Sequence, residues 1–241
     1  MSDSCKTPAQ VAASIRWRLR RGGDAEHAQD VQWFFKEEIK SHGWRTAALR
    51  REARRQRREI VELHGLDFLV QVADELFCSP VLEEKNFAVF LLEKLTDKLG
   101  DEEFRLLESW LLRIASWADH DALVYYLIGN MIVAKPSRKS AVFRWARSRD
   151  RWHRRAACVA LIPGTRRRMF FTEIVRLSDF LLADEDDMVR KGLGWLLRET
   201  ARADAQKTIP HLIQIRGRAP RLVLRTACET LSAANKKKIL E

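Results

Sequence analysis

The segment "SWADHDAL" places Trp117 four residues before Asp121, with Asp119 between them. The segment lies at a junction between two expected helices, with Asp119 or Asp121 near the start of the second, and indole faces attract cations. The simpler interpretation is a helix cap supplied by Asp119 or Asp121, together with a core tryptophan. The segment taken alone favours that simpler interpretation.

A second cluster, "KGLGWLLRE", places Lys191, Trp195 and Arg198 at positions i, i+4 and i+7. On a helix these three side chains lie on one face. Gly192 and Gly194 lie beside that face. Each glycine costs about 1 kcal/mol relative to alanine in a helix. We therefore expect them to let neighbouring helices, or the backbone of a ligand, approach closely.

Two further clusters are rich in arginine. "DRWHRRAA" places Arg154 and Arg155 in a first helical turn, where cations oppose the helix dipole, and this suggests an anionic partner. The simpler alternative is a solvated basic turn. The run 45–58, "RTAALRREARRQRR", contains Arg50 and predicts a basic amphipathic helix that faces phosphate, with a merely solvated face as the alternative.

The overall charge also points to a polyanion. The chain of 241 residues has 44 Lys+Arg against 33 Asp+Glu, a formal net charge of +11. Such a surface suits nucleic acid or an anionic membrane surface, although a generic basic protein is the alternative. No apolar run approaches the length of about 18 residues that spans a bilayer, and the polar start "MSDSCKTPAQ" has no secretory h-region. We expect no membrane association.

The cysteines and histidines give no sign of a metal site or cofactor. The four cysteines are scattered singly, as suits a reducing cytosol. Cys5 lies in a polar stretch. Cys78, Cys158 and Cys228 lie in apolar stretches, where we expect them to act as small core residues. Phosphate-loop, dinucleotide-binding and nucleophile-elbow motifs are all missing. We therefore expect no metal, no cofactor, and none of the chemistries that those motifs support.

Apolar residues recur at three and four positions throughout, which predicts helix after helix. The hydrophobic content of 46% is enough for a sizeable core. The expected helices cover roughly 7–21, 25–41, 45–63, 66–78, 82–98, 101–116, 119–134, 138–148, 151–162, 168–182, 186–203, 205–215 and 219–233.

Five similar segments begin at residues 86, 121, 155, 191 and 225, so the period is close to 35 residues. A period of this length with two helices in each repeat is typical of a helical solenoid, although amphipathic helices can resemble one another by chance. We expect a single all-α domain over 1–241: a right-handed solenoid of about 12–13 HEAT-like helices with a concave basic face, its repeats clearest over 82–233. Asp121, Arg155, Lys191 and Arg225 should then form a row.

These segments together resemble the DNA alkylation repair family, the AlkD-like HEAT-repeat DNA glycosylases, over roughly residues 30–205. "WFFKEEIKSHGWRTAALR" is similar to the family's aromatic–basic helix, glycine turn and arginine, and "ELFCSPVLEEKNFAVFLLEKL" to its next helix pair. "SWADHD" keeps the W-x-x-x-D spacing, with Gly129 eight residues after the aspartate. "WHRRAA" and "GWLLRE" match two further motifs. The departures are Ala118, where a second tryptophan can occur, and the acidic pair Glu37-Glu38.

The resemblance implies a role for each matched residue. Trp117, Trp195 and Asp121 would form the catalytic cleft, and Arg155 and Arg198 would hold the DNA backbone. Three further residues are candidates for DNA binding because of their positive charge and their positions in the clusters above, namely Lys191, Arg154 and Arg50.

The function implied by the resemblance is hydrolysis of the N-glycosidic bond of cationic alkylated purines, such as 3-methyladenine and 7-methylguanine. The substrate would be duplex DNA undergoing base excision repair, with the base left stacked. We expect a cytoplasmic monomer that is nucleoid-associated when bound to DNA. The alternative is a non-catalytic helical-repeat scaffold that binds nucleic acid or an acidic protein. Only the enzyme requires Asp121 to be unpaired and to point between the two tryptophans. His120 and His153 are expected to be exposed residues at helix starts.

Overall fold

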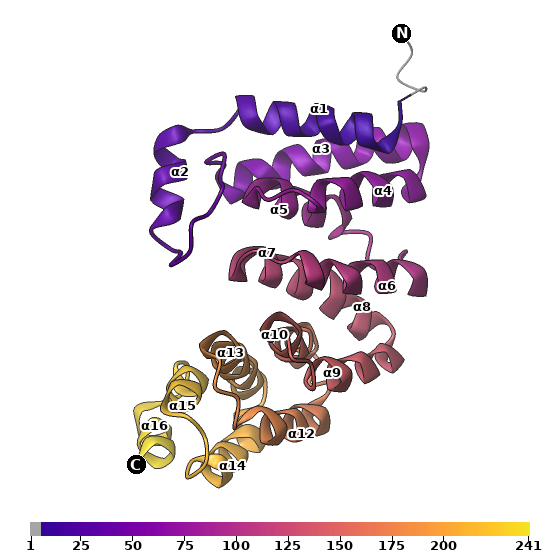
Figure 1. Ribbon diagram of the computed structural model, residues 1–241. Coiled ribbons are helices and arrows are strands. Elements are labelled where there is room, and N and C mark those ends of the chain that lie inside the picture. The colour runs from indigo at the N-terminus through magenta and orange to yellow at the C-terminus, as the bar shows by residue number, and fades with distance from the viewer. Residues whose placement is uncertain (1–5) are drawn as a thin grey trace. The chain divides into compact units, whose positions relative to one another are not determined.

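The computed structural model describes residues 6–241, so Cys5 and the first residues of "MSDSCKTPAQ" lie outside the described residues. The described residues form helices and no named strand; Lys40 and Val81 make one isolated bridge (Figure 1). None of the described helices is long and apolar enough to cross a membrane. The chain divides into two compact units, Met1–Leu123 and Val124–Glu241. That the chain is a single repeat domain remains a prediction.

The first unit is a stack of helices that pack pairwise, with α1 against α4, α3 against both α4 and α5, and α4 against α5 (Figure 1). Its buried faces follow the helical period; α3, for example, buries Leu49, Ala53 and Ile60 together with the polar Gln56. The elements are α1 (Pro8–Arg21), α2 (Ala25–Gln32), α3 (Thr46–His64), α4 (Leu66–Phe77), α5 (Leu82–Leu92), α6 (Asp101–Ser109), a 3-10 helix (Trp110–Arg113) and α7 (Trp117–Asp121).

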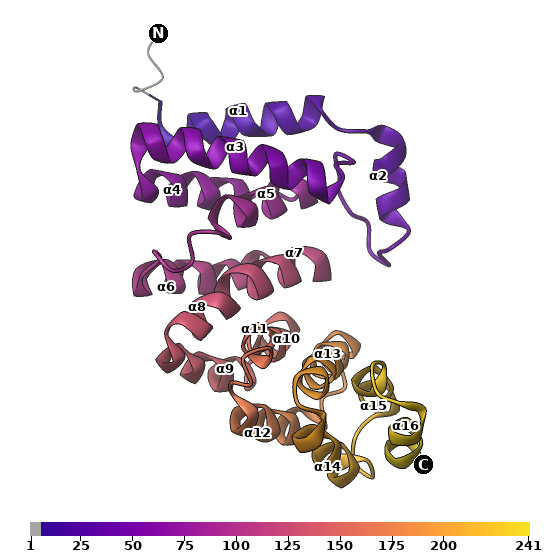
Figure 2. The ribbon, with the colours of Figure 1, turned by 180° about the vertical axis from the view of Figure 1, so that it is seen from behind.

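The second unit has two layers of helices. In one layer α13 packs between α10 and α15, and in the other lie α12, α14 and α16 (Figures 1 and 2). The elements after α7 are a π-helix (Ala122–Ile128), α8 (Gly129–Ala134), a 3-10 helix (Pro136–Lys139), α9 (Ser140–Trp145), α10 (Arg151–Val159), α11 (Ile162–Thr165), α12 (Phe171–Leu181), α13 (Asp187–Ala203), α14 (Ala205–Ile215), α15 (Arg221–Cys228) and α16 (Ala233–Leu240).

The repeat predicted from the sequence corresponds to real helices. The five similar segments lie in α5, in α7 with the π-helix, and in α10, α13 and α15. Equivalent helices of successive repeats pack on each other, as α10, α13 and α15 do within the second unit. This stacking is the structural hallmark of helical-repeat proteins. The predicted all-helical repeat fold is therefore confirmed.

Several local predictions were wrong. The helix predicted over 25–41 ends at Gln32, because the side chain of Gln32 bonds to the chain that follows and turns it away from the helix. The helix predicted over 82–98 ends at Leu92, and α11 and α16 were missed. Cys78 is exposed, whereas Cys158 and Cys228 are buried as predicted. Burial in the apolar interior raises the pKa of the Cys158 thiol to about 12.

The glycines of α13 let helices pack closely. A Cβ atom added to Gly192 would lie 3.2 Å from Cγ of Arg155 on α10, and one added to Gly194 would lie 2.7 Å from Cβ of Thr226 on α15. Both of these neighbours are protein side chains. Of the two explanations that the sequence left open for these glycines, the close approach of helices is therefore the one observed.

We predict that Gly194→Ala destabilises the protein. Overpacking of this kind costs about 1–3 kcal/mol, which outweighs the gain of about 1 kcal/mol that alanine brings to a helix. Urea unfolding would measure the change in the free energy of unfolding. Gly217→Ala is the matched control, because a Cβ atom at Gly217 meets nothing within 4 Å. A Gly194→Ala protein as stable as the control variant would contradict the packing role.

Candidate functional site

The start of α7 is fixed by Asp119. Its Oδ1 accepts a hydrogen bond of 2.7 Å from the backbone N–H of Ser116, and its Oδ2 accepts one of 2.9 Å from the N–H of Ala115. The hydroxyl of Ser116 also donates to Asp119. Together these contacts form a capping box. The sequence left open whether Asp119 or Asp121 caps this helix, and Asp119 does so.

A buried lysine lies next to this capped helix start. Lys85 of α5 has only 3% of its side chain exposed, and its Nζ lies 3.9 Å from Oδ2 of Asp119. The ammonium group also donates to the carbonyl of Phe77 at 3.1 Å and to the carbonyl of Arg113. Burial lowers the pKa of Lys85, while the charge of Asp119 acts in the opposite direction. The sequence analysis missed this residue, whose only signal was a lysine between "VLEE" and the apolar run "NFAVFLL".

Trp117 is not a core residue, because 36% of it is exposed. Its indole ring stacks on the ring of Phe35, with centroids 5.1 Å apart and planes 18° from parallel. Phe35 lies just after α2, so a segment far away in sequence holds one face of this tryptophan. The sequence analysis did not single out Phe35. Its position in the aromatic run "WFF" was the available signal.

Asp121 lies next to a fully buried histidine. Nδ1 of His120 is 2.8 Å from Oδ1 of Asp121, so a protonated Nδ1 donates to the carboxylate. The side chain of His120 is 0% exposed and that of Asp121 is 18% exposed. The prediction that His120 is exposed was therefore wrong, because its ring is buried and has the carboxylate of Asp121 as a polar partner. The expectation that Asp121 is unpaired was also wrong.

The predicted face of α13 is present in the second unit. Lys191 is exposed and Trp195 and Arg198 are half-buried, whereas Leu193, Leu196 and Leu197 between them are buried. The ring of Trp195 stacks on that of Tyr125, with centroids 5.8 Å apart and planes 14° from parallel. Each of the two candidate tryptophans thus has one face covered by another aromatic ring.

Three of the candidate arginines already have acidic partners. Arg198 lies 3.3 Å from Glu199 and also pairs with Glu229. Nε of Arg154 donates to Asp184 at 2.6 Å.

Arg50 of α3 lies 2.8 Å from Glu93 and over the ring of Phe90. A phosphate group would therefore compete with these carboxylates for each of the three arginines.

Arg155 differs from its neighbours in the predicted row. It is only 6% exposed, and its guanidinium group donates to the carbonyl of Met188 at the start of α13. Lys191 and Arg225 are exposed, so the row does not share one environment. The contacts of Arg155 join α10 to α13, and its role in binding DNA remains a prediction.

The arginine run predicted as a basic amphipathic helix is α3. Its exposed residues include four arginines, namely Arg51, Arg54, Arg55 and Arg58, together with Glu59 and Glu62 in its second half. A hydrogen bond with Glu52 raises the pKa of Arg55, and burial lowers the pKa of Arg57. The amphipathic helix is confirmed, and its contact with phosphate remains a prediction.

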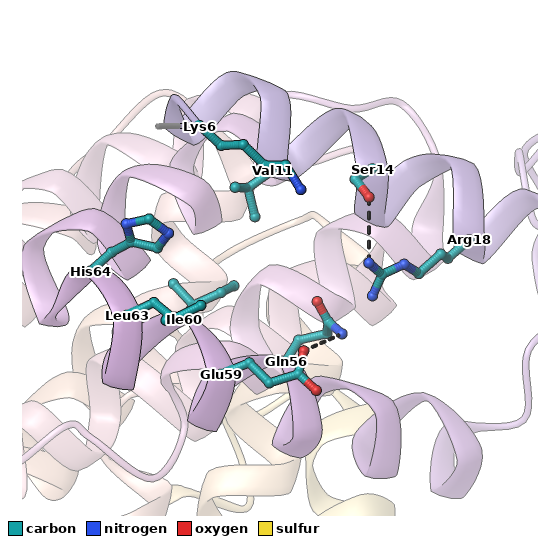
Figure 3. Close-up of a pocket in the computed structure, with 9 residues that line it drawn as sticks. All are labelled: Lys6, Val11, Ser14, Arg18, Gln56, Glu59, Ile60, Leu63 and His64. Atoms are coloured by element: carbon teal, nitrogen blue, oxygen red, sulfur yellow. Dashed lines mark hydrogen bonds between the residues drawn. The ribbon is translucent and has the colours of Figure 1, made fainter. Parts of the chain in front are cut away.

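Two other features lie apart from these residues. A small hollow between α1 and α3 is lined by Lys6, Arg18, Ile60 and neighbouring side chains, and none of the predicted site residues lines it (Figure 3). Among the described residues, no group of three or more His, Cys, Asp or Glu side chains could hold a metal ion. That the protein works without a metal remains a prediction.

Comparison with known proteins identifies the family of this chain. Residues 15–231 match the family described as "DNA alkylation repair enzyme". The chain belongs to this family. A solved structure described as a "Predicted DNA alkylation repair enzyme from Enterococcus faecalis" has the same fold, with a TM-score of 0.78 and 15% sequence identity; the match covers 88% of this chain and 97% of that one. A search of curated proteins found no match. Membership in the family gives the protein a role in the repair of alkylated DNA.

We predict that Lys85→Ala destabilises the first unit strongly. The substitution leaves the carbonyls of Phe77 and Arg113 without their donor and removes the cation 3.9 Å from the buried carboxylate of Asp119. Removing one member of a buried pair costs about 3–5 kcal/mol. Urea unfolding followed by circular dichroism would measure the loss. Lys98→Ala, at an exposed position, is the matched control and should change stability by less than about 0.5 kcal/mol. Equal stability of the two variants would show that Lys85 does not support α7.

Proposed function

We propose that the protein is a DNA glycosylase that hydrolyses the N-glycosidic bond of cationic alkylated purines in duplex DNA. The main support is the arrangement in α7. Asp119 caps the helix, and Asp121, which contacts His120, follows the half-exposed Trp117 by one helical turn. Phe35 stacks on the ring of Trp117. Membership in a family of DNA alkylation repair enzymes supports the same conclusion.

The chemistry follows from the charge of the substrate. A purine alkylated at N3 or N7 carries a positive charge, so breaking its bond to C1′ releases a neutral base. The sugar takes up the positive charge as the bond breaks. A carboxylate next to the sugar stabilises that charge and orients the water that adds to C1′. One proton is lost from the water, and the products are the free base and an abasic site.

Three residues of α7 have a part in this scheme. Asp121 supplies the negative charge, and the exposed part of the Trp117 indole favours cations by about 0.5–2 kcal/mol, depending on desolvation. Trp195 of α13 is a second indole that favours cations. His120 is a positioning residue, because its hydrogen bond to Oδ1 fixes the orientation of the Asp121 carboxylate.

The DNA backbone would be bound by cations of the second unit and of α3. Lys191 is exposed on the face that carries Trp195, and Arg198 lies one turn further along. The exposed arginines of α3 add positive charge in the first unit. Arg154 and Arg155 would act mainly through the helices that they join, since each is bonded within the protein. The protein would act as a monomer in the cytoplasm, on the nucleoid.

The deciding experiment is single-turnover incubation with matched duplexes that carry one lesion each. A duplex containing 7-methylguanine or 3-methyladenine should lose the base and become cleavable at the abasic site. A uracil duplex should stay intact, because uracil leaves as a poor anion unless an acid protonates it. Binding without any base release would favour the non-catalytic scaffold. Release of uracil as fast as 7-methylguanine would exclude selection by charge.

We predict that Asp121→Asn keeps DNA binding and lowers the rate of 7-methylguanine release by at least about 100-fold, as loss of one electrostatic stabiliser does in other enzymes. Amide and carboxylate have the same shape, so the hydrogen-bonding position beside His120 stays occupied. Asp97→Asn, an exposed aspartate after α5, is the matched control. A normal single-turnover rate for Asp121→Asn would remove this carboxylate from the mechanism.

We predict that Lys191→Ala and Arg198→Ala each reduce the slope of log affinity against log salt by about 1, because each loses one phosphate contact. Fluorescence anisotropy over a range of salt concentrations would measure the slope. Lys207→Ala on α14, in the other helix layer, is the control. A slope as steep as that of the control would mean that the residue does not touch phosphate.

A further inference from the structure

The second unit has a hollow between its last two helices. α15 and α16 pack beside each other (Figures 1 and 2), and the hollow between them is open to solvent. Half-buried side chains of Leu222 and Leu240 line it together with three cations, namely Arg221, Arg225 and Lys236. Cations beside apolar side chains suit a ligand that has both an anionic and an apolar part.

The cations of this hollow are not neutralised within the second unit. Arg225 and Lys236 have no acidic partner among the residues that the structure describes. Arg221 donates to an uncharged backbone carbonyl of α16 at 2.6 Å. The one carboxylate that lines the hollow, that of Glu229, already pairs with Arg198 of α13. An anion that enters the hollow therefore has no carboxylate to displace from Arg225 or Lys236.

Positive charge is also concentrated at the start of α15. Arg221 is the first residue of this helix, and its N-cap, Pro220, makes no side-chain cap. A cation at a helix N-terminus opposes the helix dipole, and two cations one turn apart, such as Arg221 and Arg225, repel each other. An anion bound beside both arginines would relieve both effects.

The hollow adjoins the face of α13 that carries candidates for DNA binding. α13 packs on α15, and Arg198 reaches across to Glu229. Along α15, Glu229, Arg225 and Arg221 follow one another at intervals of four residues, so they lie on one face. A polyanion that lies along this face of α13 would therefore meet the hollow next.

We propose that the hollow binds a sugar–phosphate segment of duplex DNA, with its three cations on the phosphates and its two leucines against the deoxyribose. Contacts to phosphate and sugar set the position of a protein on a duplex without reading its sequence. The inference rests on the proposed function in taking duplex DNA as the partner. It adds an anchor on α15 and α16 to the face of α13 that carries Trp195.

The test removes the two cations that have no acidic partner. The double variant Arg225→Ala, Lys236→Ala leaves Arg221 and its bond to α16 in place. Fluorescence anisotropy with an undamaged duplex, over a range of salt concentrations, should give a slope of log affinity against log salt that is lower by about 2, because two phosphate contacts are lost. The loss of affinity should be the same for every duplex sequence.

Two further variants serve as controls. Lys207→Ala, Arg218→Ala removes the same amount of charge from α14 and the turn after it, where Arg218 pairs with Asp179 of α12 at 2.9 Å. Its salt slope should equal that of wild type. The charge-keeping variant Arg225→Lys, Lys236→Arg should also keep the slope, which separates the loss of charge from a change in packing.

A salt slope of the double variant equal to that of the Lys207→Ala, Arg218→Ala control would overturn the proposal. Isothermal titration with inorganic phosphate would then distinguish the remaining ligand. Phosphate binding by the wild type that is lost in the double variant, with the DNA slope unchanged, would make the hollow a site for a free anion.

The readout does not depend on excision, because undamaged DNA carries the same phosphates. A reduced slope in the double variant, with a wild-type protein that releases no base, would support the hollow and refute the glycosylase. An unchanged slope together with normal release of 7-methylguanine would do the reverse.

Discussion

The buried ammonium group of Lys85 joins the parts of the first unit that carry the candidate chemistry. It bonds to the carbonyl of Phe77 at the end of α4 and to that of Arg113, and it lies near the carboxylate of Asp119. A buried charge of this kind is tolerated only when its hydrogen-bonding positions are filled. The same contacts fix where α7 starts, and the orientation of Trp117 and Asp121 follows from that start.

A second constraint is the pairing of the cationic side chains. The chain has a formal net charge of +11, yet Arg50, Arg154 and Arg198 each lie against a carboxylate. These pairs hold long side chains in defined positions before any ligand arrives. They also reduce the attraction for an arbitrary polyanion, since a phosphate has to replace a carboxylate. Exposed cations such as Lys191 attract without that competition.

The helical repeat could be predicted from the sequence, because the spacing of apolar residues and the period near 35 residues can both be read from the order of the amino acids. It also placed Lys191, Trp195 and Arg198 on one face of a helix. It could not show that Arg155 and His120 are buried, because burial depends on which helix packs against the residue. Nor could it find Lys85 or the stacking of Phe35 on Trp117. Each of those contacts joins residues distant in sequence, and nothing local distinguishes a buried lysine from a solvated one.

The enclosure of α13 has a consequence for how the second unit opens. This helix packs between α10 and α15. In a repeat protein each element is stabilised chiefly by its neighbours. Amide protons of an enclosed helix therefore exchange with solvent only when the cooperative unit around them opens. The helix that carries Trp195 should accordingly be among the most slowly exchanging elements of the second unit.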